Sequence, residues 1–368
     1  MTQSQLEIQF VAALVAAACA LPGVLLVLRR VALMSDAISH TVLLGIVIGF
    51  TLLRDIENPL LIVFAAGAGV LTVSLTELLL KTRRVHEDAA IGLVFPALFS
   101  IAVILITQNF SDVHLDVDAV LLGELAFAPF NRLNVLGLSL PRGAVVMGAI
   151  LLLNLALLVL FYKELKLAAF DAALASALGF SPILIHYGLM TIVSVTAVGA
   201  FDHVGSVLVI ALMIAPPAAA YLLTDHLGRM FAYSVIIGVL SAIAGYWVAR
   251  ALNVNISGAM ASIAGALFLA ALLFAPERGL VARQLQRTRR RYRFAVEMLL
   301  VHLKRHENTP DEAAENSLSH LVEELGWKPE LAKTTVQMAL GQGWIERQAE
   351  ALRLTEPGRR TAADLLAR

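Results

Sequence analysis

The sequence predicts an all-α polytopic membrane protein of about eight or nine transmembrane helices, followed by a small α+β domain in the cytosol. Apolar residues make up 59% of the 368 residues, and Asp, Glu, Lys and Arg only 15%, against roughly 45–50% and 25% in soluble domains. Residues 281–368 hold 15 of the 28 basic and 12 of the 28 acidic side chains. The composition therefore excludes an ordinary soluble protein and divides the chain near residue 280.

Nine apolar segments are long enough to cross a bilayer as helices. They run over residues 8–28, 31–53, 60–80, 88–107, 143–162, 183–200, 204–222, 230–250 and 256–275. The first lacks the basic start of a signal peptide and is followed by more apolar sequence, so we expect it to be retained. Residues 108–142 include AVLLGELAFAPF, which is too short to span alone and leaves the helix count open by one.

Basic residues between the spans predict the orientation, because cytosolic loops are enriched in Lys and Arg. With the N-terminus outside and the C-terminal domain in the cytosol, nine basic residues fall in cytosolic loops and four in external loops. The cytosolic set is Arg29, Arg30, Lys81, Arg83, Arg84, Lys163, Lys166, Arg229 and Arg278, and the external set is Arg54, Arg132, Arg142 and Arg250.

Two ionisable residues interrupt the second span. Asp36 and His40 lie four residues apart in VALMSDAISHTVLLGIVIGF, a spacing that places both side chains on one helical face. Ionisable groups at bilayer depth are costly and by default mark a transport pathway. Carboxylate oxygen and imidazole nitrogen are ligands shared by manganese, iron and zinc. We predict a metal pathway here; the alternative is hydrogen bonding to neighbouring helices near the cytosolic end.

The short joint GAFDHVG connects the sixth and seventh spans and carries Asp202 and His203 between Gly199 and Gly205. Glycines permit a tight or broken-helix turn, and irregular backbone at membrane depth is tolerated where it lines a cavity. Asp202 and His203 are therefore candidates for the same pathway, with a merely solvated loop as the equal alternative.

The cytosolic loop FYKELKLAAFDAALASALGFSPIL predicts a short helix. Asp171 is suited to cap its start, Gly179 to end it, and Pro182 prevents its continuation. Such a helix on the inner face is either a docking element for another protein or a plain interfacial helix. Its candidate contact residues are Asp171, Ala173, Leu174, Ala175, Leu178 and Gly179.

No catalytic motif is present. The sequence has no G-K-[ST] of a P-loop, no H-E-x-x-H, no G-x-S-x-G and no Rossmann fingerprint. The single cysteine, Cys19, excludes an internal disulfide. We therefore expect a non-enzyme without a permanently bound cofactor, in which any use of ATP requires a separate subunit.

Six stretches of the chain, in order, resemble the membrane permeases of metal-type ABC transporters, which import manganese, zinc or iron with an extracytoplasmic metal-binding protein. They are ALMSDAISHTVLLG, EDAAIGLVFPALFS, HLDVDAVLLGELAF, YKELKLAAFDAALASALGFS, GSVLVIALMIAPPAAAYLLT and SGAMASIAGALFLAALLFAPERG. The resemblance implies a permease in a bacterial inner membrane, paired with a second copy or paralogue. Two ABC ATPase subunits would bind ATP and rock the two halves to alternate access.

The same resemblance implies roles for individual residues. Asp36 and His40 match the family's SDAxSH-like motif, in which they are implicated in metal coordination. The helix from Asp171 to Gly179 matches the coupling helix that sits in a groove of the ATPase. An acidic residue at Asp202 is usual in the manganese and iron branch, whereas His203 replaces an expected small residue and leaves room for zinc. This ranks manganese first, iron second and zinc third.

Two other functions stay open: a secondary metal transporter without an ATPase, and a membrane-tethered, metal-responsive transcription regulator.

A basic segment connects the permease domain, residues 1–280, to the last domain, residues 306–368. This segment, residues 281–305, holds eight basic groups against the single Glu297. A basic cluster beside a span binds anionic lipid headgroups. We therefore expect a juxtamembrane linker and first helix here rather than a nucleic-acid site.

Residues 306–368 read as helices separated by Gly326 and Pro329, a two-strand ribbon in WIERQAEALRLT, and a closing helix. This pattern is similar to the winged-helix module of iron-dependent repressors related to the diphtheria toxin repressor. Residues 308–368 hold seven basic and ten acidic groups, which opposes DNA binding and favours protein contact. The candidate contact residues are Lys333, Thr334, Thr335 and Gln337, and His302, His306 and His320 are either metal-sensing or ordinary surface and packing histidines.

Overall fold

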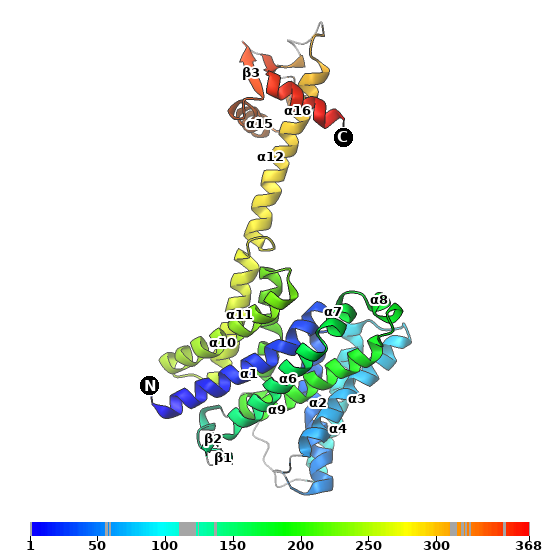
Figure 1. Cartoon of the computed structure of the whole chain (residues 1–368), viewed down its shortest axis with the longest axis vertical. Coiled ribbons are helices and arrows are strands. Elements are labelled where there is room, and N and C mark those ends of the chain that lie inside the picture. Colours follow the sequence, from blue (N-terminus) through cyan, green and yellow to red (C-terminus); the bar gives the residue numbers. More distant parts are fainter. Residues whose placement is uncertain are drawn as a thin grey trace. The chain divides into compact units, whose positions relative to one another are not determined.

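The computed structural model describes residues 2–367 apart from 56–57, 59, 110–122, 124, 136–137, 310–314, 318–319, 321, 324 and 349–350. The chain divides into two compact units, Met1–Gly279 and Leu280–Arg368 (Figure 1). The first unit is helical and apolar, and the second is a small mixed unit.

Eight helices of the first unit, within the described residues, are long and apolar enough to cross a membrane. They are α1 (Gln3–Leu28), α2 (Leu33–Leu53), α3 (Leu61–Lys81), α4 (Glu87–Asn109), α6 (Arg142–Leu160), α9 (Pro182–Leu223), α10 (Leu227–Leu252) and α11 (Ile256–Phe274). The predicted helical membrane protein with about eight spans is confirmed.

Helix α9 contains two of the predicted spans, 183–200 and 204–222, in one run of 42 residues with a break inside it. Gly205, at the break, has φ 76° and ψ 166°. That region of backbone space is open to glycine and strained for other residues. The glycines of GAFDHVG therefore mark a broken helix, as the sequence predicts.

Contacts with α1 show that α9 turns back at this break. Asn154 Nδ2 donates to Ala18 O at 3.0 Å and to Thr196 Oγ1 at 2.9 Å, so Thr196 lies beside Ala18. Along α9, Thr196 lies near Ala18 of α1, His203 near Val11, and Met213 near Gly23. The contacts thus move toward the start of α1 before Gly205 and toward its end after Gly205. Because this order reverses, the two arms of α9 run antiparallel to each other.

Helix α1 lies in the core of the first unit, with 78% of its most apolar stretch buried. Small residues let backbones approach closely, as is usual between helices in membranes. A Cβ on Gly23 would lie 2.2 Å from the carbonyl oxygen of Met213, and one on Gly238 would lie 3.5 Å from Ala16 Cβ. Ser234 Oγ also donates to Ala20 O at 3.4 Å.

Short elements connect the helices at both ends. Helices α7 (Tyr162–Phe170) and α8 (Ala172–Ala177) lie between α6 and α9. The 3-10 helix η1 (Leu125–Phe127) is followed by the antiparallel strands β1 (Arg132–Val135) and β2 (Leu138–Pro141), in which Leu133 pairs with Leu140. Most of residues 108–124 lies outside the described residues, so that part of the 108–142 segment stays a prediction.

The second unit consists of α12 (Leu280–Arg305), α15 (Pro329–Gly341), the antiparallel strands β3 (Ile345–Gln348) and β4 (Ala351–Leu354), and α16 (Glu356–Leu366). The predicted ribbon and closing helix are present. Its core is formed by Val296, Leu299, Leu300, Leu303, Val336, Ala339, Ile345, Leu352, Leu354 and Ala362. The predicted helix before Gly326 lies partly outside the described residues, and the winged-helix fold itself stays a prediction.

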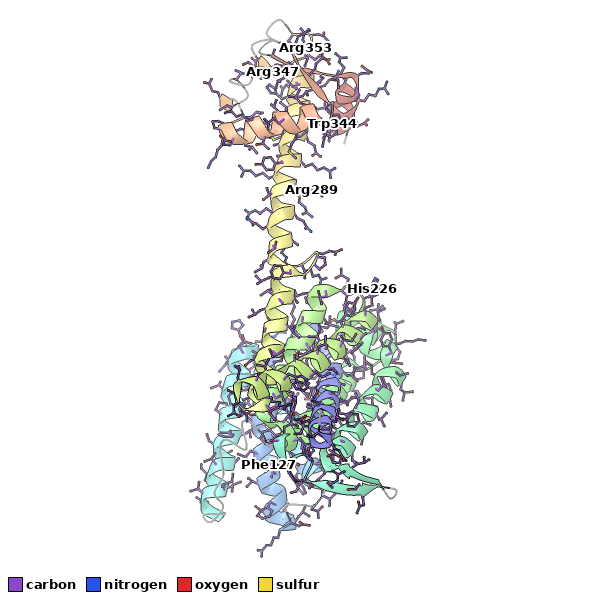
Figure 2. All side chains as sticks on the ribbon, turned by 90° about the vertical axis from the view of Figure 1, so that its left-hand side faces the viewer. Phe127, His226, Arg289, Trp344, Arg347 and Arg353 are labelled. Atoms are coloured by element: carbon purple, nitrogen blue, oxygen red, sulfur yellow. The ribbon has the colours of Figure 1, made fainter. Side chains whose placement is uncertain are left out.

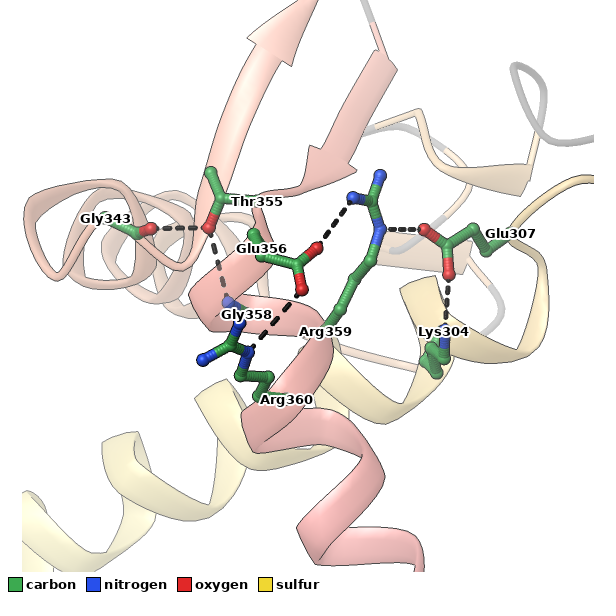
Figure 3. A network of polar contacts seen from close by, with 8 residues as sticks. All are labelled: Lys304, Glu307, Gly343, Thr355, Glu356, Gly358, Arg359 and Arg360. Carbon is green, nitrogen blue, oxygen red and sulfur yellow. Dashed lines mark hydrogen bonds and ion pairs between the residues drawn. The ribbon is translucent and has the colours of Figure 1, made fainter.

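A polar network fastens α16 to the rest of the second unit (Figure 3). Thr355 caps α16, since its hydroxyl accepts from Gly358 N at 3.3 Å and donates to Gly343 O at 2.6 Å. Glu307 accepts from Lys304 at 2.6 Å and from Arg359. The Lys304 ammonium, aided by the Arg359 guanidinium, holds the pKa of Glu307 below its ordinary value.

Candidate functional site

Asp36 and His40 face each other on α2. Asp36 lies in the first turn, and its Oδ1 is 3.4 Å from His40 Nε2. A tetrahedral site with metal–ligand bonds of the usual length separates its ligand atoms by about 3.3 Å. The two side chains are 39% and 31% exposed, while Ala37, Ile38 and Ser39 beside them are buried. The pair is therefore spaced to hold one ion between its two atoms and open enough to receive it.

Aromatic rings of α4 hold the imidazole of His40 in place. The Phe95 ring stacks on it with a centroid distance of 5.6 Å and an interplanar angle of 26°. Phe99 contacts it by an edge, with a centroid distance of 6.2 Å. One side of the Asp36–His40 pair is thus dry and apolar.

Asp202 and His203 end the first arm of α9, next to Gly205. Asp202 is exposed and His203 half-buried. A Cβ on Gly143 would lie 3.3 Å from the His203 ring and 3.0 Å from Val11. Val11 lies 17 residues before Leu28, the end of α1, which is about 25 Å along a helix. Asp36, in the first turn of α2, lies near that end of α1. The two predicted pairs therefore lie toward opposite ends of the helices and do not form one coordination shell.

A cluster that sequence reasoning missed joins α3 to α9. Glu77 Oε1 lies 2.9 Å from His186 Nε2, and Tyr187 donates its hydroxyl hydrogen to Glu77 Oε2 at 2.6 Å. The Nδ1 atom of His186 is buried and has no hydrogen-bond partner among the described residues. Glu77 interrupts the apolar stretch LTVSLTELLLK, so the rule that drew attention to Asp36 also applies to it.

Helix α8 has the ends that the sequence predicts. Asp171 accepts from Leu174 N at 2.9 Å, and Gly179, with φ +87°, follows its last turn. Within this short helix only Ala175 is buried; Ala173 and the other residues are exposed. The exposed apolar side chains on and around it are Phe170, Leu174, Leu178, Phe180, Ile183 and Leu184. This surface, at the joint between α7 and α9 (Figure 1), is apolar and exposed, which makes it a candidate for contact with another molecule.

The four candidate contact residues of the second unit lie on α15. Lys333 and Gln337 are exposed. Thr334 and Thr335 donate to the backbone of Glu330 and Leu331, at 2.8 and 2.7 Å, and Thr335 is fully buried. Two of the four side chains are therefore free to contact a partner.

A model of the ABC 3 transport family matches residues 3–275, which include every helix of the first unit that could cross a membrane. The chain belongs to the ABC 3 transport family. The match ends before the second unit, which begins at Leu280.

Relatives of this ABC 3 family chain are membrane proteins of metal transport systems. The zinc transport system membrane protein TroD of Treponema pallidum (strain Nichols) is 48% identical over 353 residues, covering 96% of each chain. The manganese transport system membrane protein MntD of Bacillus subtilis (strain 168) is 46% identical over 274 residues, covering 74% of this chain and 92% of that one. TroD is thus similar to this chain across both units.

A solved structure shows the same membrane fold. A chain in "PsaBC from Streptococcus pneumoniae in complex with Fab" superposes with a TM-score of 0.64 at 26% identity, covering 76% of this chain and 94% of that one. The ABC 3 family chain is accordingly a multi-pass permease of an ABC transport system in a bacterial membrane.

Proposed function

We propose that the chain is the permease subunit of an ATP-driven importer of divalent transition-metal ions. The observation that carries this proposal is the Asp36–His40 pair, held with its ligand atoms 3.4 Å apart on one face of an apolar helix. The names of relatives that are 48% and 46% identical, one a zinc and one a manganese transport protein, support it.

Two ligands suit passage better than storage. One carboxylate and one imidazole fill two of the four to six positions of a divalent ion. The remaining positions are left to water or to a second permease copy, so the ion binds weakly enough to leave. Asp202 and His203, toward the other end of the helices, would meet the same ion at a different depth of the path.

Energy would enter through helix α8. Its exposed Leu174 and Leu178 would become buried in a groove of the ATPase, and each buried leucine contributes about 1.5–3 kcal/mol. The Asp171 cap and Gly179 stop keep the helix short and fixed, so that movement of the ATPase is passed to α7 and α9. This apolar face favours an ATPase-driven permease over a secondary transporter.

The excess of basic residues in the loops assigned to the cytosol supports an external N-terminus and a cytosolic second unit. Helix α1 then runs inward and α8 faces the cytosol, where an ATPase resides. The connection that holds η1 and the β1–β2 hairpin becomes external, with Phe127 exposed (Figure 2). Exposed aromatic residues are frequent anchors at interfaces, which suits docking of an extracytoplasmic metal-binding protein.

For the metal, we keep manganese first, iron second and zinc third. The carboxylates of Asp36 and Asp202 favour manganese, while the imidazoles of His40 and His203 are also good zinc ligands. Relatives named for zinc and for manganese are almost equally similar to the chain. Competition among the three ions during uptake decides this ranking.

The test is metal uptake by the chain reconstituted with its ATPase in liposomes. Asp36→Ala and His40→Ala should each lower uptake about tenfold or more, since even removal of an outer partner of a metal ligand costs roughly 10–100-fold in affinity. Asp88→Ala, at an exposed carboxylate of α4, is the control and should transport normally. Full uptake by either pathway variant, or uptake without the ATPase, would overturn the proposal.

The cap of α8 gives a second test. Asp171→Ala should weaken co-purification of the ATPase, because loss of a helix N-cap costs about 0.5–2 kcal/mol. Asp171→Asn keeps a good capping side chain and should bind as the wild type does. Equal binding by the two variants would remove α8 from the interface.

For the second unit we propose a winged-helix-like fold that contacts another protein rather than DNA. The acidic excess of residues 308–368 supports this. Specific binding of the full chain to duplex DNA at physiological salt would contradict it and favour the tethered regulator.

A further inference from the structure

A second group of metal-ligating side chains lies in the second unit, away from the pathway residues. Among the described residues, His302, His306 and Glu315 each place one ligand atom within 4.8 Å of the others. None of the three takes part in the core of the first unit or in α8.

The end of α12 brings the two histidines together: His302 lies in its last turn, and His306 directly follows it and donates its backbone N–H to His302 O at 3.2 Å. They are four residues apart, so both rings lie on one face, and their centroids are 4.6 Å apart. Pairs of histidines at this spacing are a usual arrangement for binding one metal ion on a helix.

Glu315 reaches the histidines from a segment that β4 holds in place. Its backbone oxygen lies 3.3 Å from His302 Nε2. The next residue, Asn316, accepts at its backbone oxygen from Leu352 N of β4 at 3.0 Å. The carboxylate is therefore positioned by the fold and not by the helix that carries the histidines.

His320 supports the carboxylate from outside, with Nε2 2.6 Å from Glu315 Oε2. Metal-ligating groups typically have such partners, which orient them and tune their basicity. Nearby positive charge is compensated, since the Lys304 ammonium is bound to Glu307 at 2.6 Å.

Burial is graded in a way that suits binding from the cytosol. His302 is buried at 8% exposure, whereas the Glu315 side chain is 28% exposed. Ligand atoms in a tetrahedral site are about 3.3 Å apart, so separations of up to 4.8 Å must shorten by up to about 1.5 Å. The partly exposed His306 and Glu315 can make that movement without opening the core.

We propose that His302, His306 and Glu315 form a binding site for a divalent transition-metal ion in the second unit, with His320 as the outer partner of Glu315. Two imidazoles and one carboxylate with an open position are a zinc-type ligand set, so the site prefers Zn²⁺ over Mn²⁺. The ion ties the end of α12 to the segment before α15 and makes the second unit a reader of metal concentration. This inference does not rest on transport by the first unit.

The test is equilibrium binding of Zn²⁺, Mn²⁺ and the spectroscopic probe Co²⁺ to the full, detergent-solubilised chain stripped of metal. Asp36→Ala/His40→Ala serves as the background, so that pathway binding does not contribute. In it, Zn²⁺ should bind at one ion per chain, bound Co²⁺ should show visible absorption typical of imidazole ligation, and Mn²⁺ should bind more weakly.

The variant His306→Gln/Glu315→Gln should lose this ion and the Co²⁺ absorption. His320→Ala should bind Zn²⁺ roughly 10–100-fold more weakly, as expected for loss of an outer partner. Because it leaves the three proposed ligands in place, it still tests the site if the double variant fails to fold. His86→Gln/His226→Gln, at exposed histidines of the first unit, is the control and should bind as the background does.

Circular dichroism without metal checks the fold of each variant. The proposal would be overturned if both His320→Ala and a correctly folded His306→Gln/Glu315→Gln variant bound Zn²⁺ with unchanged affinity. So would equal losses in the control, which would show adventitious binding to surface histidines.

Discussion

At the scale of single residues, Glu77 does more than interrupt an apolar helix. Its two carboxylate oxygens are divided between His186 and Tyr187, both in the first turns of α9. This fixes the end of α3 against the start of the arm that follows α8. A carboxylate with two partners at this place ties α3 to the helix that directly follows the proposed docking helix α8.

We predict that Glu77→Gln destabilises the chain, because one charged hydrogen-bond partner is lost and such bonds contribute about 1.5–3 kcal/mol. The thermal unfolding midpoint in detergent should fall. Glu164→Gln is the matched control: Glu164 Oε2 is buried without a hydrogen-bond partner among the described residues. An equal loss in both variants would mean that the His186 and Tyr187 contacts contribute nothing.

Sequence reasoning at this scale found ionisable residues but not their neighbours. Spacing alone placed Asp36 and His40 on one face, and their 3.4 Å separation agrees with it. Spacing did not predict how deeply His203 is buried, because its burial depends on Val11 and Gly143 in two other helices. Contacts between distant segments leave no periodic trace in a single sequence.

At the scale of elements, the break in α9 decides where Asp202 and His203 lie relative to Asp36 and His40. A φ of 76° at Gly205 lets a chain of apolar residues reverse direction without an exposed loop. Asp202 and His203 are thereby held at one end of the helices. The other glycines of α9, Gly188 and Gly199, do not have a positive φ and are not needed for the turn.

Gly205→Ala should therefore be costly, because a residue with a side chain forced into this region is strained by about 1–3 kcal/mol. Gly188→Ala, in the same helix, is the control, since its Cβ would meet no described atom within 4 Å. It should be neutral or slightly stabilising. Thermal unfolding and the yield of monodisperse protein measure both; similar behaviour would show that Gly205 tolerates a side chain.

Most elements were predictable because their signals are local. Apolar runs gave the spans, Asp171 and Gly179 gave the ends of α8, and the glycines of GAFDHVG gave the turn. The β1–β2 hairpin was missed, since RLNV and LSLP are too short for an alternating pattern. It is held instead by Arg132, whose guanidinium reaches Glu7 of α1 at 3.0 Å and Ser139 Oγ at 2.8 Å.

At the scale of the whole molecule, the chain joins a permease fold to a unit that the family model does not cover. The match ends at residue 275 and the second unit begins at Leu280. Each unit has its own core. The division falls where the charge density of the sequence changes, near residue 280.

Ending the chain at Gly279 should leave uptake and ATPase binding intact, since no element of the first unit is removed. Response of uptake to raised cytosolic metal should be lost if the second unit regulates transport. Reconstituted uptake at several internal metal concentrations measures both. Loss of all uptake by a truncated chain that still co-purifies the ATPase would show that the second unit is part of the transport machinery.

The glycine contacts also show which helix faces are closely packed and which are open. Backbones meet without clearance where Gly23 faces Met213, and a Cβ on Gly69 would lie 2.1 Å from Ser194 Oγ. Gly92 of α4, by contrast, has no described atom within 4 Å of its Cβ position. Gly92 therefore lies on an open face of α4, whereas Phe95 and Phe99 of the same helix contact the imidazole of His40. Any displacement of α4 away from α2 would expose that ring to solvent or to an ion.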